Sequence, residues 1–271
     1  MTRGSWGPLL LAAAVIAVGG YLLWGSKLFT PAPAPAPAAP PATAASAQRP
    51  AETASAAPIE LPAPATPLAA SEVAKALTDL LGRKAVASFL QLEDFPRRLA
   101  ATVDNLGRAH APAALWPVNP TPGRFTVEER DSGSVIAADN GARYTPFVLL
   151  AEGVDAGRAA DLYVRMYPLL QRSYQELGYP KGYFNERVLA IIDLLLATPA
   201  VESPVKVQLA EVKGPVPSLR PWVRYEYADP ALESLSAGQK ILLRVGPVNA
   251  RRLKAKLVQL RQEIVARAIR R

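Results

Sequence analysis

The sequence predicts an α+β fold, a mainly helical module with a small β-hairpin, preceded by one transmembrane helix and a disordered linker. Three observations predict this organisation. An uncharged stretch runs from Gly4 to Ser26, residues 31–67 hold 11 prolines and 15 alanines, and periodic apolar patterns begin near Leu68. Because domains usually contain about 100–200 residues, residues 68–271 suffice for one substantial core.

Residues 1–27 are expected to form a retained membrane anchor. Pro8–Trp24 reads PLLLAAAVIAVGGYLLW, and a helix of this length approaches the thickness of a hydrocarbon core. Arg3 precedes the apolar run, which favours a cytoplasmic N-terminus and an exported C-terminal module. A cleaved signal peptide is the alternative, but its best cleavage sequence, Ala45-Ser46-Ala47, lies far from the apolar run.

Residues 28–67 are expected to form a disordered linker rich in proline and alanine. Proline fixes φ and removes a backbone donor, so a stretch such as PAPAPAP at Pro31–Pro37 forms neither a helix nor the interior of a sheet. A polyproline II chain rises about 3.1 Å per residue, so the linker would hold a folded module away from a bilayer. A spacer is favoured over a proline-recognition motif.

The first part of the module is predicted to contain three helices. They cover Glu72–Leu81, Lys84–Leu92 and Pro96–Leu106. Ser71 is the expected N-cap of the first helix, and Pro96 suits the first turn of the third.

A proline-rich loop and a hairpin are expected next. Residues 108–123 form the loop and contain His110 and Trp116. Two short strands, Phe125–Glu129 and Val135–Ala138, flank a cluster of turn residues and predict the hairpin.

Helices dominate the second part of the module as well. Asp155 is the expected N-cap of a long helix that ends at Leu177, with a kink at Pro168 inside it. The remaining elements are expected to be a helix over Asn185–Ala197, strands over Val205–Val212 and Trp222–Tyr227, a helical region over Pro230–Val245 and a helix from Val248 to the C-terminus.

Several of these segments contain distinctive motifs. They are Val103-Asp104-Asn105-Leu106, Asn140 with Arg143-Tyr144, Tyr167-Pro168-Leu169-Leu170-Gln171, Leu177-Gly178-Tyr179-Pro180, Tyr183-Phe184-Asn185, Ile192-Asp193, Gly238-Gln239-Lys240, Gly246-Pro247 and Asn249-Ala250. Over about Leu68–Leu260 the chain resembles an uncharacterised proteobacterial domain-of-unknown-function family of anchored envelope proteins. The resemblance implies a bacterial inner-membrane protein with a cytoplasmic N-terminus and a periplasmic module, and it implies no activity.

The composition excludes several classes of chemistry. The chain has no cysteine and a single histidine, which rules out disulfides, zinc fingers, thiol nucleophiles and two-histidine metal sites. Glycine-rich phosphate loops and EF-hand spacing are missing as well. No metal and no cofactor is expected.

Two groups of polar residues are candidates for a site. A polar site could be formed by Asp104, Asn105, Asn140, Arg143 and Tyr144. Asp193 lies among apolar residues and is a candidate buried acid, which would need a cation. Both groups have structural alternatives: a helix-end hydrogen-bonding pair at Asp104-Asn105, and an ion pair at Asp193. The candidate cations for that pair are Arg98, Arg143, Arg165 and Arg244.

The C-terminal segment carries the positive charge. Residues 239–271 hold ten Lys/Arg and one acid, so they account for the whole net charge of +8. A helical apolar stripe from Leu253 to Ala268 would pack on the module and present cations outward. The candidate anion-binding face consists of Arg251, Arg252, Lys254, Lys256 and Arg261. A solvated face that aids solubility is the alternative, and the expected topology disfavours nucleic acid.

A stripe of aromatic and aliphatic residues lies on the long central helix. Tyr163, Tyr167, Leu170, Tyr174 and Leu177 follow one another at helical spacing. Such a stripe is interpreted here as core, with the hydroxyl groups at its edge, although it could also line a groove for a peptide or glycan.

Two functions of different classes remain. The favoured one is a non-catalytic binding or assembly module, which its tether holds near an anionic envelope polymer, lipid head groups or an envelope protein. The alternative is a carboxylate-dependent envelope hydrolase that cleaves glycans, since that chemistry needs only two acids. The sequence shows no arrangement that marks such a pair, so no catalytic residue is assigned.

Overall fold

All the residues described by the computed structural model belong to one compact unit, Ala54–Arg271. The described residues are 59–61, 63–131, 133–201, 204–210 and 223–270. The expected anchor over residues 1–27 and the linker up to residue 58 lie outside them. Within this described part of the chain, no helix combines the length and the apolar character needed to cross a membrane.

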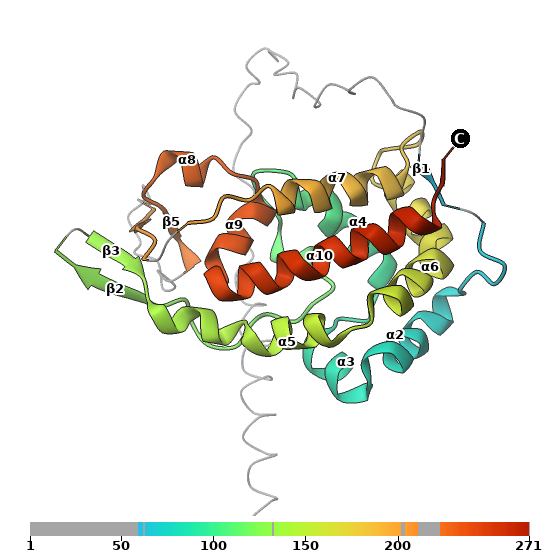
Figure 1. Cartoon of the computed structure of the whole chain (residues 1–271), viewed down its shortest axis with the longest axis horizontal. Helices are drawn as coiled ribbons and strands as arrows, with labels where there is room; N and C mark the ends of the chain where they lie inside the picture. Colours follow the sequence, from blue (N-terminus) through green and yellow to red (C-terminus); the bar gives the residue numbers. More distant parts are fainter. Residues whose placement is uncertain (1–58, 62, 132, 202–203, 211–222, 271) are drawn as a thin grey trace, which may run out of the picture. The chain divides into compact units, whose positions relative to one another are not determined.

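The unit is mainly helical with minor β structure, as the sequence predicts (Figure 1). Its longer helices are α2 (Val73–Leu81), α3 (Arg83–Phe89), α4 (Phe95–Leu106), α5 (Thr145–Gly153), α6 (Ala156–Glu176), α7 (Phe184–Leu196), α9 (Ala237–Arg244) and α10 (Pro247–Arg267). Its short helices are α8 (Pro230–Glu233) and the 3-10 helices η1 (Ala70–Glu72), η2 (Ala113–Leu115) and η3 (Ala138–Arg143).

The described strands form small antiparallel pairs. The predicted hairpin is confirmed, because β2 (Val127–Arg130) pairs with β3 (Gly133–Ile136). The expected strands after α7 are found as β4 (Val207–Leu209) and β5 (Tyr225–Tyr227), which pair with each other. The expected strand ends at Val212 and Trp222 lie outside the described residues.

A third strand pair joins the two ends of the unit. β1 (Ile59–Glu60) pairs with β6 (Ile269–Arg270), and Leu61 is buried at 8% exposure. The folded unit therefore begins before residue 68, and the expectation that the linker continues to residue 67 is wrong for residues 59–61. The physical reason is local composition, because Ile-Glu-Leu interrupts the proline and alanine with side chains that can pair and pack.

Helix ends follow the capping rules in some places and depart from them in others. The Asp155 carboxylate accepts a hydrogen bond from the Arg158 amide at 2.7 Å, which confirms the predicted N-cap of α6. Ser71 is not a cap, since it lies inside η1 and the Glu72 carboxylate accepts from the Ala69 amide instead. Helix α3 ends before the predicted Leu92 because Leu90 turns into a β-bridge with Val118.

Helix α5 was not predicted from the sequence. It is short, its second residue is a proline, and its apolar residues do not follow a helical stripe: Val148 is fully buried, while Phe147 and Leu149 are exposed. The spacing of apolar residues therefore does not indicate a helix in this segment. Helix α6 continues through Pro168 as a single element, and the kink expected at that residue stays a prediction.

The largest core cluster lies where α2, α3 and α4 pack against α6. Leu170 of α6, Ala100 of α4 and Phe184 at the start of α7 are all fully buried. Tyr174 is buried, and Tyr163 and Tyr167 pack against the same cluster, so the interpretation of the stripe as core is confirmed for its tyrosines. Leu177, at the end of the stripe, is exposed.

Helix α10 crosses the unit and packs against α5, α6 and α7 (Figure 1). Ile264 of α10 is buried with Ala160 of α6 and with Leu189 and Ile192 of α7 in a second apolar cluster. The predicted apolar stripe of this helix therefore docks on the module.

Glycine permits the close approach of α9 to the ends of α4 and α7. A Cβ atom on Gly238 would lie 2.7 Å from Leu195 Cδ2 and 3.1 Å from the Leu106 carbonyl oxygen. The Ala237 amide donates to the Arg108 carbonyl oxygen at 2.7 Å, which fixes the start of α9 at this junction.

We expect Gly238→Ala to lower the free energy of unfolding by about 1–3 kcal/mol, because overpacking forces the neighbouring residues apart. Urea denaturation of the full-length chain, followed by far-UV circular dichroism, measures the change. Gly153→Ala is the matched control, since a Cβ there meets no atom within 4 Å. It should be neutral or stabilising by less than about 1 kcal/mol, and equal destabilisation by both variants would contradict the packing argument.

Candidate functional site

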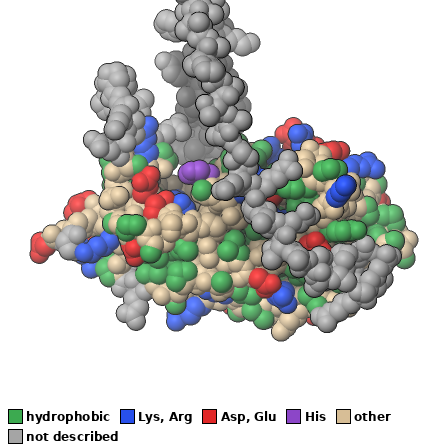
Figure 2. All heavy atoms as spheres, turned by 90° about the horizontal axis from the view of Figure 1, so that it is seen from above, with side chains coloured by type: hydrophobic (Ala, Val, Ile, Leu, Met, Phe, Trp, Pro, Cys, Tyr) green, Lys and Arg blue, Asp and Glu red, His purple; other side chains and the backbone are tan. Residues whose placement is uncertain are grey.

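The largest of the described surface cavities is a groove between residues 109–116, β5, α8 and α9, with a volume of about 650 Å³. We call it the α8–α9 groove. Its polar lining consists of His110, Trp116, Arg224, Glu226, Glu233, Lys240 and Arg244. His110 is the single histidine of the chain, and Figure 2 shows it at the surface of this face.

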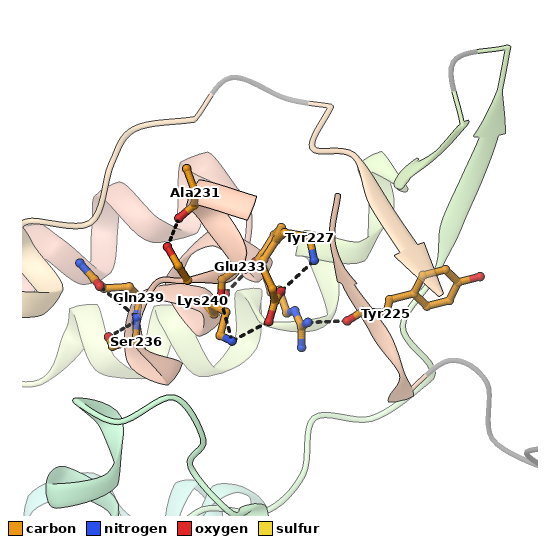
Figure 3. Close-up of polar contacts among 9 residues, drawn as sticks. Tyr225, Tyr227, Ala231, Glu233, Ser236, Gln239 and Lys240 are labelled. Carbon is orange, nitrogen blue, oxygen red and sulfur yellow. Dashed lines mark hydrogen bonds and ion pairs between the residues drawn. The ribbon is translucent and has the colours of Figure 1, made fainter. Parts of the chain in front are cut away.

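Capping residues position the two helices that border the groove. The Asp229 carboxylate accepts from the Ala231 amide at 2.8 Å and starts α8. Ser236 and Gln239 form a reciprocal capping box that starts α9 (Figure 3). The two caps bring Glu233 at the end of α8 next to Lys240 of α9.

Glu233 is held as a carboxylate by two donors (Figure 3). The Lys240 ammonium donates to Oε1 at 2.7 Å, and the Tyr227 amide donates to Oε2 at 2.9 Å. Burial alone would raise the pKa of Glu233, but these donors outweigh it and lower the pKa below its ordinary value. Glu233 is therefore a carboxylate near neutral pH.

Arg244 lines the groove and contacts Tyr227, which is buried at 1% exposure. Its guanidinium lies over the Tyr227 and Phe125 rings, 5.4 and 5.9 Å from their centroids, and donates to the Tyr225 carbonyl oxygen at 2.6 Å. The Tyr227 hydroxyl donates to the Lys240 carbonyl oxygen, and burial raises the pKa of this phenol. In Figure 3 the Tyr225 ring points away from the Glu233–Lys240 pair.

Two buried nitrogen atoms of groove residues have no hydrogen-bond partner among the residues that the structure describes. They are Nε1 of Trp116 and Nε of Arg244. Buried donors are normally paired, so two unpaired donors among the residues that line one groove call for an explanation beyond the fold itself.

The predicted polar site is divided between two networks. Asp104, at 4% exposure, lies in α4 with Oδ2 2.5 Å from Arg108 Nη2, and the Tyr179 hydroxyl donates to the same oxygen at 3.3 Å. Arg187 of α7 places Nε 3.2 Å from Oδ1 and donates to the Asp104 carbonyl oxygen. Burial and the Asp104 charge raise the pKa of Tyr174, which stacks on Tyr179, to about 12.

The second network contains Asn140, which is fully buried in η3. Its Oδ1 accepts from Arg143 at 2.9 Å and from the Thr126 amide at 3.3 Å, and its Nδ2 donates to the Arg244 carbonyl oxygen. Asn249 reinforces this link by donating to the Gly141 carbonyl oxygen at 2.8 Å. The network joins η3 to the α9–α10 corner.

The remaining members of the predicted polar site serve local contacts. Asn105 donates to the Ala101 carbonyl oxygen within α4. The Arg143 guanidinium lies over the Tyr144 ring, with Cζ 5.3 Å from the ring centroid. Within the described part of the chain, the two networks share no hydrogen-bonding residue, and each is explained by the elements that it connects.

Asp193, the candidate buried acid, is exposed, and the alternative of an ion pair is the one found. Its side chain is 52% exposed and forms a two-point ion pair with Arg261 of α10, with distances of 2.6 and 3.0 Å. Asp193 occupies the outer face of α7, while Ile191 and Ile192 occupy the inner face. None of the four arginines proposed as its partner makes this contact.

Most residues of the predicted anion-binding face form hydrogen bonds or ion pairs with other parts of the module. Lys254 donates to the Thr198 carbonyl oxygen after α7, and Lys256 donates to the Val154 carbonyl oxygen after α5. Arg252 lies 3.9 Å from Glu152, and Arg261 pairs with Asp193. Among the described residues, Arg251 is the member of this face that makes no hydrogen bond or ion pair.

Sequence reasoning missed the groove almost entirely. His110 and Trp116 were placed in the proline-rich loop, but no spacing connects them to Glu233 or Lys240, which lie more than 100 residues further along the chain. Within the residues described, no group of three His, Asp or Glu side chains is placed to hold a metal ion.

The comparisons place the chain in a family. Residues 95–261, more than half of the chain, match DUF3014, described as a protein of unknown function, and the chain belongs to this family. The matched region contains the two polar networks, α9 and the polar groove lining. Neither the curated proteins nor the solved structures contain a match.

We expect Asp104→Asn to lower the free energy of unfolding by about 3 kcal/mol, because it removes the buried charge that two arginines compensate. Urea denaturation of the full-length chain measures the change. Asp79→Asn is the matched control, since Asp79 also pairs with a cation four residues away but both side chains are exposed. That variant should change stability by less than about 1 kcal/mol, and a similar small effect at Asp104 would refute a stabilising role for the network.

We expect Glu233 to make stability depend on acid pH. Because its pKa is lowered on folding from 4.5, its contribution is present above that pH and is lost as the pH falls through the folded-state pKa. Glu233→Gln should therefore be less stable than the unchanged chain near neutral pH, and the difference should shrink below about pH 4. Thermal unfolding across a pH series measures it, and a difference that is constant with pH would contradict the argument.

Proposed function

We propose that the chain is a single-pass inner-membrane protein whose periplasmic module binds a cell-envelope ligand in the α8–α9 groove. The apolar N-terminal segment and the linker rich in proline and alanine support the tethered arrangement. The resemblance to anchored envelope proteins supports the location. A tether of this kind raises the effective concentration of the module near the envelope without adding any contact.

The fixed Glu233–Lys240 pair is the observation that favours binding over catalysis. A glycan hydrolase needs one carboxyl group with a raised pKa as its general acid. The pKa of Glu233 is shifted in the opposite direction, and both of its oxygens accept hydrogen bonds from the module itself. The groove is therefore better suited to holding a ligand than to transferring a proton.

The groove lining indicates the chemical class of the ligand. It presents an indole at Trp116, an imidazole at His110, and charges of both signs at Arg224 and Glu226. A ligand with flat apolar faces, hydroxyl and amide groups, and carboxylates would match this mixture. A glycan polymer of the cell wall has all of these groups, and we propose it as the ligand.

Binding to cell-wall sacculi tests the proposal. The full-length chain, purified in a nonionic detergent, should co-sediment with peptidoglycan sacculi. Trp116→Ala and Arg224→Ala should each weaken binding about tenfold, since a few central aromatic and arginine contacts usually dominate affinity. Co-sedimentation at increasing sacculus concentration gives the affinities.

Arg83→Ala is the control for charge removal, since Arg83 is exposed on α3 outside the groove. It should bind as the unchanged chain does. A chain labelled with ¹³C-histidine gives one imidazole signal, from His110, which should shift when soluble muropeptides are added. Equal binding by all variants would refute the groove as the site, and release of soluble glycan fragments would favour the hydrolase instead.

A further inference from the structure

A second groove, which the proposed function does not use, lies at the corner between α9 and α10. Its volume is about 480 Å³, within the usual range for small-molecule sites. Residues after α7 form one wall, and the end of α9 with the first turn of α10 forms the other. Its apolar lining includes Pro199, Val201, Val205, Leu242, Leu243 and Ala250. We call it the corner groove.

The walls of the corner groove are held in place by several contacts. Thr198, at 4% exposure, donates from its hydroxyl to the Leu195 carbonyl oxygen, and its own carbonyl oxygen accepts from Lys254. Gly246, with φ of 85°, makes the sharp corner, and Asn249 ties the start of α10 to η3. These contacts fix the described parts of both walls without a ligand, which lowers the cost of ordering them on binding.

The described charged residues that line the corner groove are both cations. Arg251 and Lys254 are the charged residues that line it in the described part of the chain, and no Asp or Glu is among its lining residues. Lys254 is already engaged with Thr198, whereas Arg251 is exposed and makes no ion pair among the described residues. The first turn of α10 adds the partial positive charge of a helix N-terminus.

We propose that the corner groove binds an anionic amphiphile, with its acyl chain along the apolar walls and its carboxylate or phosphate at Arg251. Apolar walls alone would accept any hydrophobic ligand, and a lone arginine would accept any anion. The two features lie side by side, so a ligand that carries both a chain and a negative head group satisfies them together. A free fatty acid and an anionic phospholipid share this chemistry.

Photolabelling of the full-length chain in a nonionic detergent tests this proposal, with a palmitic acid that carries a diazirine as the probe. The labelled residues should lie within 199–201 or 242–250 or be Val205. Unlabelled palmitate and phosphatidylglycerol are added in separate experiments as competitors of the probe. The compound that reduces labelling more strongly identifies the ligand as a free fatty acid or as a phospholipid. Methyl palmitate, which lacks the charge, and acetate, which lacks the chain, should compete at least tenfold less well.

Two variants and one control complete the test. Arg251→Ala should weaken labelling about tenfold, and it should fold normally because Arg251 is exposed and makes no ion pair among the described residues. Ala250→Trp should block the groove directly. Arg83→Ala, which removes an exposed cation from α3, should leave labelling unchanged.

The proposal is overturned if methyl palmitate competes as well as palmitate, if the label lies outside the groove, or if Arg251→Ala labels normally. Competition by an acidic peptide as strong as that by palmitate would also overturn it. Arg251→Ala should co-sediment with sacculi as the unchanged chain does, and Trp116→Ala should be photolabelled normally. The proposals for the corner groove and for the α8–α9 groove can therefore be refuted separately.

Discussion

The buried carboxylate of Asp104 is the interaction on which the arrangement of the central helices depends. A carboxylate at 4% exposure is tolerated only when cations and donors surround it. Arg108 lies just after α4, whereas Arg187 comes from α7 and Tyr179 from the connection between α6 and α7. Satisfying one charge therefore requires three parts of the chain to take fixed relative positions.

The α9–α10 corner depends on this arrangement in turn. Helix α9 begins at the end of α4, where Ala237 donates to the Arg108 carbonyl oxygen, and Gly238 permits the close packing against Leu106 and Leu195. The other end of α9 is fixed to η3 through Asn140 and Asn249. Because both ends are held, the part of each groove that α9 contributes has a fixed position. The geometry of this part of the lining thus follows from contacts that lie outside the grooves.

Local features of the fold could be predicted from the sequence, and distant contacts could not. The cap at Asp155, the β2–β3 hairpin and the ends of α4 and α7 depend on residues a few positions apart, which pattern rules describe. The partner of Asp193 lies 68 residues away, and that of β1 lies at the other end of the unit. The groove was missed for the same reason, since its two sides come from segments that no periodicity relates.

The positive charge of the C-terminal segment shows why composition alone misleads about partners. Lys254 and Lys256 donate to carbonyl oxygens that follow α7 and α5, where the helix dipole leaves partial negative charge. Arg261 and Arg267 pair with Asp193 and Asp161 on α7 and α6. A cation used in this way stabilises helix packing, and its side chain is no longer free to move toward an external anion. The positive excess is therefore weak evidence for an anionic partner, and the place of a single cation such as Arg251, beside an apolar groove, is more informative than the net charge.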